Sequence, residues 1–378
     1  MSGTTHPSAA GVVLSTSDGS GSWTWAGARL FADGGIHATQ RYADLSLQER
    51  RGRLTGQETA WLAAQWEAPS AGNRFEVRFA TGTGAEKIQA AFLVRAFAAT
   101  PDEARRRARE RLSRAAGPDG GLPSHVRSRP IDTEAELRAW LGYPSRVGGL
   151  VEVRKQLSAN RIARGGATLG YAVCHGFFDS GAPWDAWWRS FAALPFPAVL
   201  SIGFDPYDAD ILAFRSLLQR RAAELEELSR QGIPSPLNPY RVPPDQAAHA
   251  ARPGYRRALE RYAGRCFSVR MTLASADQLP PAMIESLVRT VSSVPGGARA
   301  VQVAPAEFDQ AAGEFRALGA PWLPVTYRQG LPAELDALDR VLHSLADVAE
   351  AASVLTLPVH WPGMPPVFDR DGGPLPEG

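Results

Sequence analysis

The sequence contains few of the residues that build disulfide frameworks, metal sites or membrane spans. Only Cys174 and Cys266 are cysteines among its 378 residues, which is too few for a disulfide framework or a CxxC metal knuckle. The seven histidines show no ligand spacing, so no metal site is predicted. No run of 18 apolar residues occurs, and no apolar segment follows a basic N-terminal start. We therefore expect a cytoplasmic protein without an intrinsic membrane span; peripheral attachment to a membrane-associated complex through partners is left open.

Lysine and the common catalytic motifs are equally scarce. Lys87 and Lys155 are the only lysines, so arginine supplies nearly all of the 41 basic residues. No GxSxG, no HExxH and no GxGxxG after a predicted strand occurs, and "ATGTGAEK" (80–87) lacks the GxxxxGK[ST] spacing of a phosphate loop. The formal net charge of +2 gives no global reason to expect nucleic acid or acidic lipid as a partner. We expect a non-enzymatic protein that uses no cofactor.

The residues that are present predict an α+β fold. Hydrophobic residues make up 44% of the chain, which is enough for a sizeable core. Alternating residues predict a half-buried strand in "RFEVRFATG" and a second strand in "IQAAFLVRAFA", joined as a hairpin. Thr100 and Pro101 predict the N-cap and first turn of an arginine-rich helix that ends at Gly117. Helical periodicity also predicts a helix over 208–232 and one long helix over 332–354.

Proline, glycine and serine divide the chain into five predicted parts. Residues 1–68 form a partly disordered N-terminal extension, of which 1–22 fray apart from a short apolar run at 11–14. Residues 358–378 form an extended tail rich in proline and glycine. Between them lie a first α+β unit (69–232), a proline-rich linker (233–250) and a second α+β unit that includes the long C-terminal helix (251–357).

Two segments share a design. Residues 90–112 and 266–291 each contain an alternating strand, a turn of small residues and a helix that starts with proline. A neighbouring apolar strand accompanies each of them. This pattern predicts two ferredoxin-like (split βαβ) units, with an origin by internal duplication left open.

The richest candidate chemistry lies in "AVCHGFFDSGAPWDAWW" (172–188). A nucleophilic thiol needs a nearby base, but neighbouring side chains of a strand point to opposite faces, so Cys174 and His175 cannot form their own dyad. The aromatic residues of the following helix recur at i, i+4 and i+7, as in a helix that packs on a sheet: Trp184, Trp188 and Phe191. A buried wall is therefore favoured, with an enzyme centred on Cys174 as the competing hypothesis.

A second candidate is the acidic turn "FDPYDAD". Its carboxylates, Asp205, Asp208 and Asp210, would suit a hard cation. The same residues also lie between a strand end and a helix start, where Asp208 would be an N-cap and Asp210 would favour the helix dipole. The cap explains these residues without a metal.

The arginine-rich helix is a third candidate. Six arginines are predicted to occupy its exposed arc: Arg105, Arg106, Arg107, Arg109, Arg111 and Arg114. Of these, Arg105, Arg106 and Arg109 are the candidate contacts for phosphates or an acidic protein. Because Glu103 and Glu110 offer local pairs, a solvated face is the favoured interpretation. Contact with nucleic acid or protein is left open.

The order of the segments resembles a known family. "FEVRF", "AFLVRAFAATPDEARRRARERL" and "GGLVEVRK" are followed by "FPAVLSIGFDPYD", "CFSVRMTLAS" and "LHSLADVAEAASVLTLPVHWPGMPP". From about residue 70 to 365 this order resembles the N-terminal, pre-ATPase region of actinobacterial HerA/FtsK-type ATP-binding proteins, which are related to type IV secretion (conjugation) ATPases. The motifs of the resemblance are apolar patterns rather than catalytic residues.

The resemblance implies an accessory role. In that family the Walker A and B residues lie in a motor domain that begins shortly after a segment like Leu357–Val359, and this sequence departs from the family there. No ATP-binding residue is carried over. The implied function is a non-catalytic scaffold that assembles with a separate HerA/FtsK-type P-loop ATPase, with homo-oligomerisation left open. An enzyme centred on Cys174 and His175, or an arginine-mediated nucleic-acid module, is the alternative.

The tail is predicted to lie extended on the surface. Its proline and glycine residues prevent a helix or a central strand. Trp361, Met364 and Phe368 would be its apolar anchors and candidate contacts for a groove of the partner. On this hypothesis, deletion of 361–378 leaves the melting temperature nearly unchanged and weakens association with the partner ATPase. A frayed terminus that binds nothing is the alternative.

Overall fold

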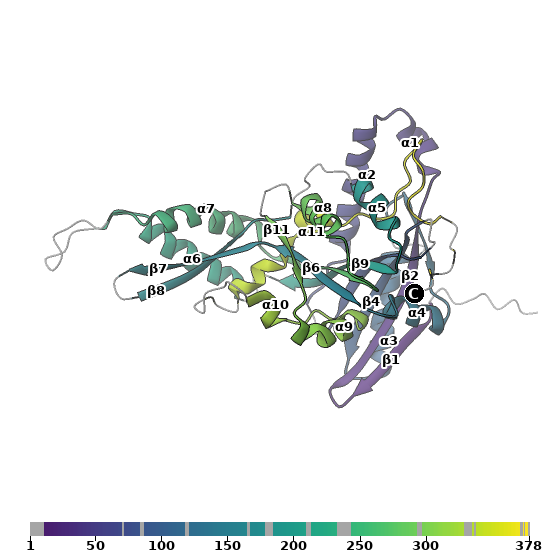
Figure 1. Ribbon diagram of the computed structural model, residues 1–378, viewed down its shortest axis with the longest axis horizontal. Coiled ribbons are helices and arrows are strands. Elements are labelled where there is room, and N and C mark those ends of the chain that lie inside the picture. Colours follow the sequence, from purple (N-terminus) through teal and green to yellow (C-terminus); the bar gives the residue numbers. More distant parts are fainter. Residues whose placement is uncertain are drawn as a thin grey trace, which may run out of the picture.

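The computed structural model describes residues 11–69, 72–83, 87–117, 121–164, 167–177, 184–208, 213–232, 243–292, 297–328, 335, 338–370, 373, 375 and 376. These residues form an α+β fold built on a ten-stranded sheet and a separate two-stranded hairpin (Figure 1). The neighbouring strands pair antiparallel throughout both. The predicted α+β class is therefore confirmed.

The elements follow one another along the whole described chain. The strands of the large sheet are β1 (Val13–Asp18), β2 (Gly21–Ala32), β3 (Arg74–Thr81), β4 (Gln89–Ala98), β5 (Val126–Pro130), β6 (Gly149–Lys155), β9 (Ala198–Asp208), β10 (Arg265–Ser275), β11 (Ala298–Gln302) and β12 (Leu345–Asp347). The hairpin consists of β7 (Leu157–Arg164) and β8 (Ala167–Cys174). The larger helices are α2 (Leu47–Ala64), α3 (Pro101–Ala116), α4 (Glu134–Gly142), α5 (Trp184–Ala192), α6 (Phe214–Leu228), α7 (Gln246–Arg261), α8 (Pro281–Val291) and α9 (Phe308–Arg316). Shorter ones are η1 (Ile36–Ala38), α1 (Gln40–Ala43), η2 (Pro305–Glu307), α10 (Pro324–Arg328), η3 (Asp339–His343) and α11 (Val348–Val354).

The strand order is the same in the two halves of the sheet. The strands run β5-β2-β4-β3-β9-β10-β6-β11, with β1 beside β2 and β12 at one end of β10. In the first half α3 connects β4 to β5, and these two strands pair with β2 on its opposite sides. In the second half α8 connects β10 to β11, and these two strands pair with β6 on its opposite sides. The two segments that share a design thus occupy matching places. Their assignment as ferredoxin-like units and their origin by duplication stay predictions.

The predicted boundary between the two units needs correction. β9 and β10 lie on opposite sides of the predicted linker 233–250, yet they pair from Arg265 opposite Asp208 to Ser275 opposite Ala198. β3 pairs with β9 and joins both halves into one sheet. A division at the linker would therefore separate strands that hydrogen-bond along their whole length. Of the linker itself, residues 233–242 lie outside the described residues, and α7 begins soon after them.

Two predicted irregular or helical segments also differ from the structure. Within the residues expected to fray, β1 and β2 form a hairpin whose two-residue turn is held by Asp18, which accepts the Ser20 N–H. The long helix predicted over 332–354 is η3, β12 and α11 where it is described. It is broken because β12 pairs with β10 and Asp347 caps α11 by accepting the Glu350 N–H.

One face of the large sheet carries the main apolar core. Phenylalanines from β3, β4, β9 and β10 cluster there: Phe75, Phe79, Phe92, Phe204 and Phe267. The helices α2, α3, α5, α8 and α11 contribute the facing residues, including Trp61, Leu112, Trp188, Leu287 and Val354. The predicted aromatic face of α5 is confirmed, since Trp188 and Phe191 are fully buried and Trp184 packs against the same core.

The opposite face of the sheet buries charged residues, so β3 is not half-buried as predicted. Glu76 and Arg78 have no exposed surface, because α4 and α9 cover them. Glu76 accepts from Arg74, Arg78 and Ser201, while Arg78 donates to the carbonyl oxygens of Trp140 and Phe315. Burial acts to raise the pKa of Glu76, but the guanidinium groups of Arg78, Arg74 and Arg270 outweigh it and hold the pKa at about 2.

An arm projects from the second half of the sheet (Figure 1). It consists of the β7–β8 hairpin, inserted after β6, and the antiparallel helices α6 and α7, inserted between β9 and β10. The arm has its own apolar cluster, which includes Leu157, Tyr171, Phe214, Leu225 and Tyr255. In α6 the buried Phe214, Leu218 and Leu225 confirm the apolar spacing predicted for the 208–232 helix. The described helix begins only at Phe214, and Ile211, predicted to be buried with them, lies outside the described residues.

The predicted surface position of the tail is wrong for two of its three anchors. Trp361 is 9% exposed and Phe368 is 3% exposed, whereas Met364 is half-buried. The tail lies beside the start of β4: the Ile88 N–H donates to the Val367 oxygen, and the Asp369 N–H donates to the Ile88 oxygen, both at 2.8 Å. Proline excludes a central strand but does not exclude this short pairing at an edge, which brings Phe368 into the core.

Candidate functional site

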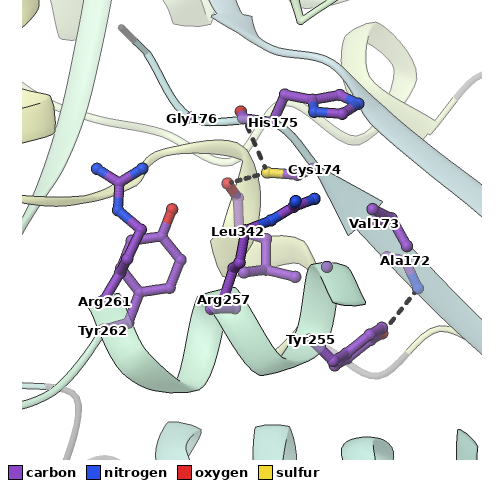
Figure 2. A pocket seen from close by; sticks show the side chains of 12 residues that line it. Ala172, Val173, Cys174, His175, Gly176, Tyr255, Arg257, Arg261, Tyr262 and Leu342 are labelled. Carbon is purple, nitrogen blue, oxygen red and sulfur yellow. Dashed lines mark hydrogen bonds between the residues drawn. The ribbon is translucent and has the colours of Figure 1, made fainter. Parts of the chain in front are cut away.

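A cavity of about 370 Å³ lies where the arm joins the sheet. We call it the arm pocket. It is bounded by the end of β8, by α7 and by η3 (Figure 2). Its lining residues are Ala172, Val173, Cys174, His175, Gly176, Gly254, Tyr255, Arg257, Ala258, Arg261, Tyr262 and Leu342. The segment that the sequence singled out therefore forms one wall of a pocket.

Cys174 lies in this wall without a catalytic partner. Its thiol donates to the carbonyl oxygen of Leu342 at 3.1 Å, and the imidazole ring of His175 points away from the sulfur (Figure 2). Burial raises the pKa of Cys174 to about 11, although the positive charge of Lys155 acts against this. The thiol is therefore protonated at neutral pH, which does not favour a nucleophilic role.

A buried ionic network lies behind the pocket wall. The Lys155 ammonium donates to Glu350 Oε1 at 2.9 Å, to the Tyr262 hydroxyl at 2.8 Å and to the carbonyl oxygen of Leu345. Glu350 also accepts the Phe177 N–H at 2.7 Å and the Tyr262 hydroxyl at 3.0 Å. Burial acts to lower the pKa of Lys155, but Glu350 outweighs it and raises the pKa. Lys155 is thus a fixed cation that holds β6, α7 and α11 together.

Alkylation should be slow at Cys174. A pKa raised from 9.0 to about 11 leaves about a hundredfold less thiolate at neutral pH than an unperturbed cysteine has. We expect iodoacetamide at pH 7.5 to modify native Cys174 at least about a hundredfold more slowly than the unfolded chain, with a rate that rises as the pH approaches 11. Mass spectrometry of the modified peptide measures this rate. Equal rates for native and unfolded protein would restore the hypothesis of a reactive thiol.

The acidic turn does not form one cluster in the described residues. Asp205 lies in β9 and pairs with the buried Arg74, while Asp208 ends the same strand three residues later, so the two side chains point to opposite faces. Asp210 lies outside the described residues. The predicted N-cap role of Asp208 is wrong, because α6 starts at Phe214. No group of three acidic, histidine or cysteine side chains that could hold a metal occurs in the described part of the chain.

The predicted arginine face lies on α3 and is largely paired. Arg105 contacts Asp102 at 3.2 Å and Arg106 contacts Glu110 at 3.0 Å, whereas exposed Arg109 has no partner among the described residues. The three arginines share an open hollow with Val13. Arg111 is not part of this solvated arc as predicted: it is buried and pairs with Glu67 at 2.6 Å.

The three tail candidates lie elsewhere on the molecule. Trp361 packs against the His37 ring, with ring centroids 5.4 Å apart, and lies under the Arg51 guanidinium. Met364 lies 3.6 Å from an Arg189 nitrogen. Together with Phe368 they border a very small cavity of about 10 Å³, which holds no ligand-sized space. They are separate from both α3 and the arm pocket.

The sequence analysis missed the pocket residues Arg257 and Arg261, and it missed Lys155, which lies behind the pocket wall. Arg257 and Arg261 are spaced i, i+4 on α7, a spacing that places both on one helix face, but their proximity to Cys174 depends on the arm. Lys155 is one of only two lysines and lies at the end of a strand segment with apolar residues. This unusual position could have identified Lys155 as a candidate from the sequence.

Comparison with known proteins adds no functional assignment. Neither a protein-family model nor a curated protein matches this chain. Among the described residues, no helix combines the length and the apolar character that a bilayer span needs.

Proposed function

We propose that the protein is a non-catalytic accessory subunit that assembles with a separate HerA/FtsK-type motor ATPase. The order of apolar segments from about residue 70 to 365 supports this proposal, since it resembles the region that precedes the motor domain in that family. The same segments form β3, β4, α3, β6, β9 and β10, so they make up the centre of the large sheet. The resemblance therefore concerns the core of the fold.

The arm is the observation that carries the proposed assembly role. Its four elements are packed mainly on one another and extend away from the large sheet, where they offer surface to a partner (Figure 1). The outer surface carries charged residues: Glu226 pairs with Arg252 and Arg256, and exposed Arg220 has no partner among the described residues. Such a solvated, projecting module suits a protein contact more than a catalytic cleft.

The test needs a P-loop ATPase encoded by a gene beside the gene for this chain; the absence of such a gene would count against the proposal. We expect the two purified proteins to form a complex in size-exclusion chromatography with light scattering, and this chain alone to hydrolyse no ATP. The paired substitution Arg220→Glu and Arg256→Glu on the arm should weaken binding by about tenfold or more through charge reversal at the contact.

The matched substitution Arg106→Glu and Arg109→Glu on α3 serves as the control. Selective weakening by the α3 pair would place the contact at the predicted arginine face and refute the arm as the contact. Hydrolysis of ATP by this chain alone, or the absence of any complex, would refute the accessory role itself.

A further inference from the structure

The arm pocket has basic side chains in its lining and no acidic ones. Arg257, Arg261 and His175 belong to its lining, and none of its lining residues is an aspartate or a glutamate. Lys155 lies directly behind the wall. The nearby carboxylates of Asp347 and Glu350 pair with Arg261 and Lys155. Among the described residues, the positive charge of Arg257 in this cluster has no carboxylate partner. The electrostatic environment therefore favours an anion.

The two arginines are held to different degrees. Arg261 is fixed: its Nε donates to Asp347 Oδ2 at 2.8 Å, and a second nitrogen lies 3.7 Å from Glu350. Arg257 is exposed and has no hydrogen bond or ion pair among the described residues. Both side chains rise from α7 on the side that faces the end of β8 (Figure 2). An anion between α7 and β8 would meet one preorganised and one available guanidinium, the group that best matches phosphate and carboxylate oxygens.

The rest of the pocket is apolar and well supported. Val173, Ala258 and Leu342 contribute apolar surface. α7 approaches β8 closely at Gly254, where a β-carbon would lie only 2.9 Å from a Val173 methyl carbon. The Tyr255 hydroxyl accepts the Ala172 N–H at 2.9 Å and fixes helix and strand together. A cavity of about 370 Å³ is small for a ligand site, so its occupant is a small molecule rather than a chain segment.

We propose that the arm pocket binds a small organic anion, whose phosphate or carboxylate group pairs with Arg257 and Arg261 and whose short apolar part contacts Val173, Ala258 and Leu342. The site would lie at the base of the arm, where η3 also meets β8 through the Cys174–Leu342 hydrogen bond. This inference does not depend on the motor partner, because it concerns the isolated chain.

Calorimetric titration with simple probes tests the proposal. Phenyl phosphate and benzoate combine an anionic group with an apolar ring, whereas phenol has the ring alone. We expect saturable binding of one or both anions at a single site and no binding of phenol. Arg257→Gln should weaken the binding about tenfold or more, because a charge-assisted pair is lost. Arg256→Gln, on the adjacent exposed position that pairs with Glu226, should leave it unchanged.

Alkylation of Cys174 locates the bound probe. At pH 9 the bound anion should slow the modification of Cys174 in the wild-type protein and in Arg256→Gln, but not in Arg257→Gln at the same probe concentration. Preference for phenyl phosphate or for benzoate identifies which anionic group the site takes. Equal weakening by both arginine substitutions, binding of phenol as strong as that of the anions, or no protection of Cys174 would each overturn the proposal.

Discussion

Substitution of Lys155 by methionine should lower the free energy of unfolding by about 3–5 kcal/mol, because it removes the nearest cation from the buried carboxylate of Glu350 and leaves only the more distant Arg261 guanidinium, at 3.7 Å. Lys155 and Glu350 both have side chains with no exposed surface, and their nitrogen and oxygen lie 2.9 Å apart. The substitution also removes hydrogen bonds to the Tyr262 hydroxyl and the Leu345 oxygen. Guanidinium denaturation followed by tryptophan fluorescence measures the change.

The sequence supplies a matched control for this experiment. Lys87 is the only other lysine, is half-buried and has no ion pair among the described residues, so Lys87→Met should change stability little. Adding Glu350→Gln to Lys155→Met should recover part of the loss, since glutamine is neutral, its oxygen can still accept the Phe177 N–H, and its amide nitrogen can donate to the Tyr262 hydroxyl. If Lys155→Met costs no more than Lys87→Met, the ionic network does not hold this region together.

Substitution of Phe368 by alanine should also cost about 3–5 kcal/mol, since it opens a cavity in the main core. The Phe368 ring lies 5.3 Å from the Trp188 ring and 6.0 Å from the Phe79 ring, measured between centroids. The sequence alone predicted that removal of 361–378 leaves stability nearly unchanged; the structure reverses this expectation. Thermal and guanidinium denaturation measure the effect.

Pro365→Ala provides the control within the tail. Pro365 is exposed, so its substitution should have a small effect. Equal stability of Phe368→Ala and wild-type protein would mean that the tail is not part of the core, and would return it to the surface role that the sequence predicted.

Local patterns in the sequence predicted many of the elements correctly. Thr100 and Pro101 begin α3, with the Thr100 hydroxyl accepting the Glu103 N–H, and α8 is the proline-started helix predicted within residues 266–291. The alternating segments around Phe75 and Phe267 are β3 and β10. These predictions succeed because helix caps and side-chain periodicity depend on residues within a few positions of one another.

Burial and strand neighbours could not be predicted in the same way. The alternation of Glu76 and Arg78 with phenylalanine is the pattern of a half-solvated strand, and only α4 and α9, which come later in the chain, cover the charged face. The composition of the tail likewise suggested a surface segment, and its pairing with Ile88 across the molecule decided otherwise.

The features of the candidate site also fall into those that the sequence predicts and those that depend on the tertiary structure. The sequence by itself determined that Cys174 and His175 cannot act as a dyad, because adjacent strand residues point apart, and it identified the aromatic face of α5. Only the tertiary structure brought Arg257 and Arg261 of α7 beside Cys174 and placed Lys155 and Glu350 behind them. Periodicity specifies which face of a helix or strand is apolar, whereas the meeting of charged groups from distant segments depends on how those faces pack, which no local pattern records.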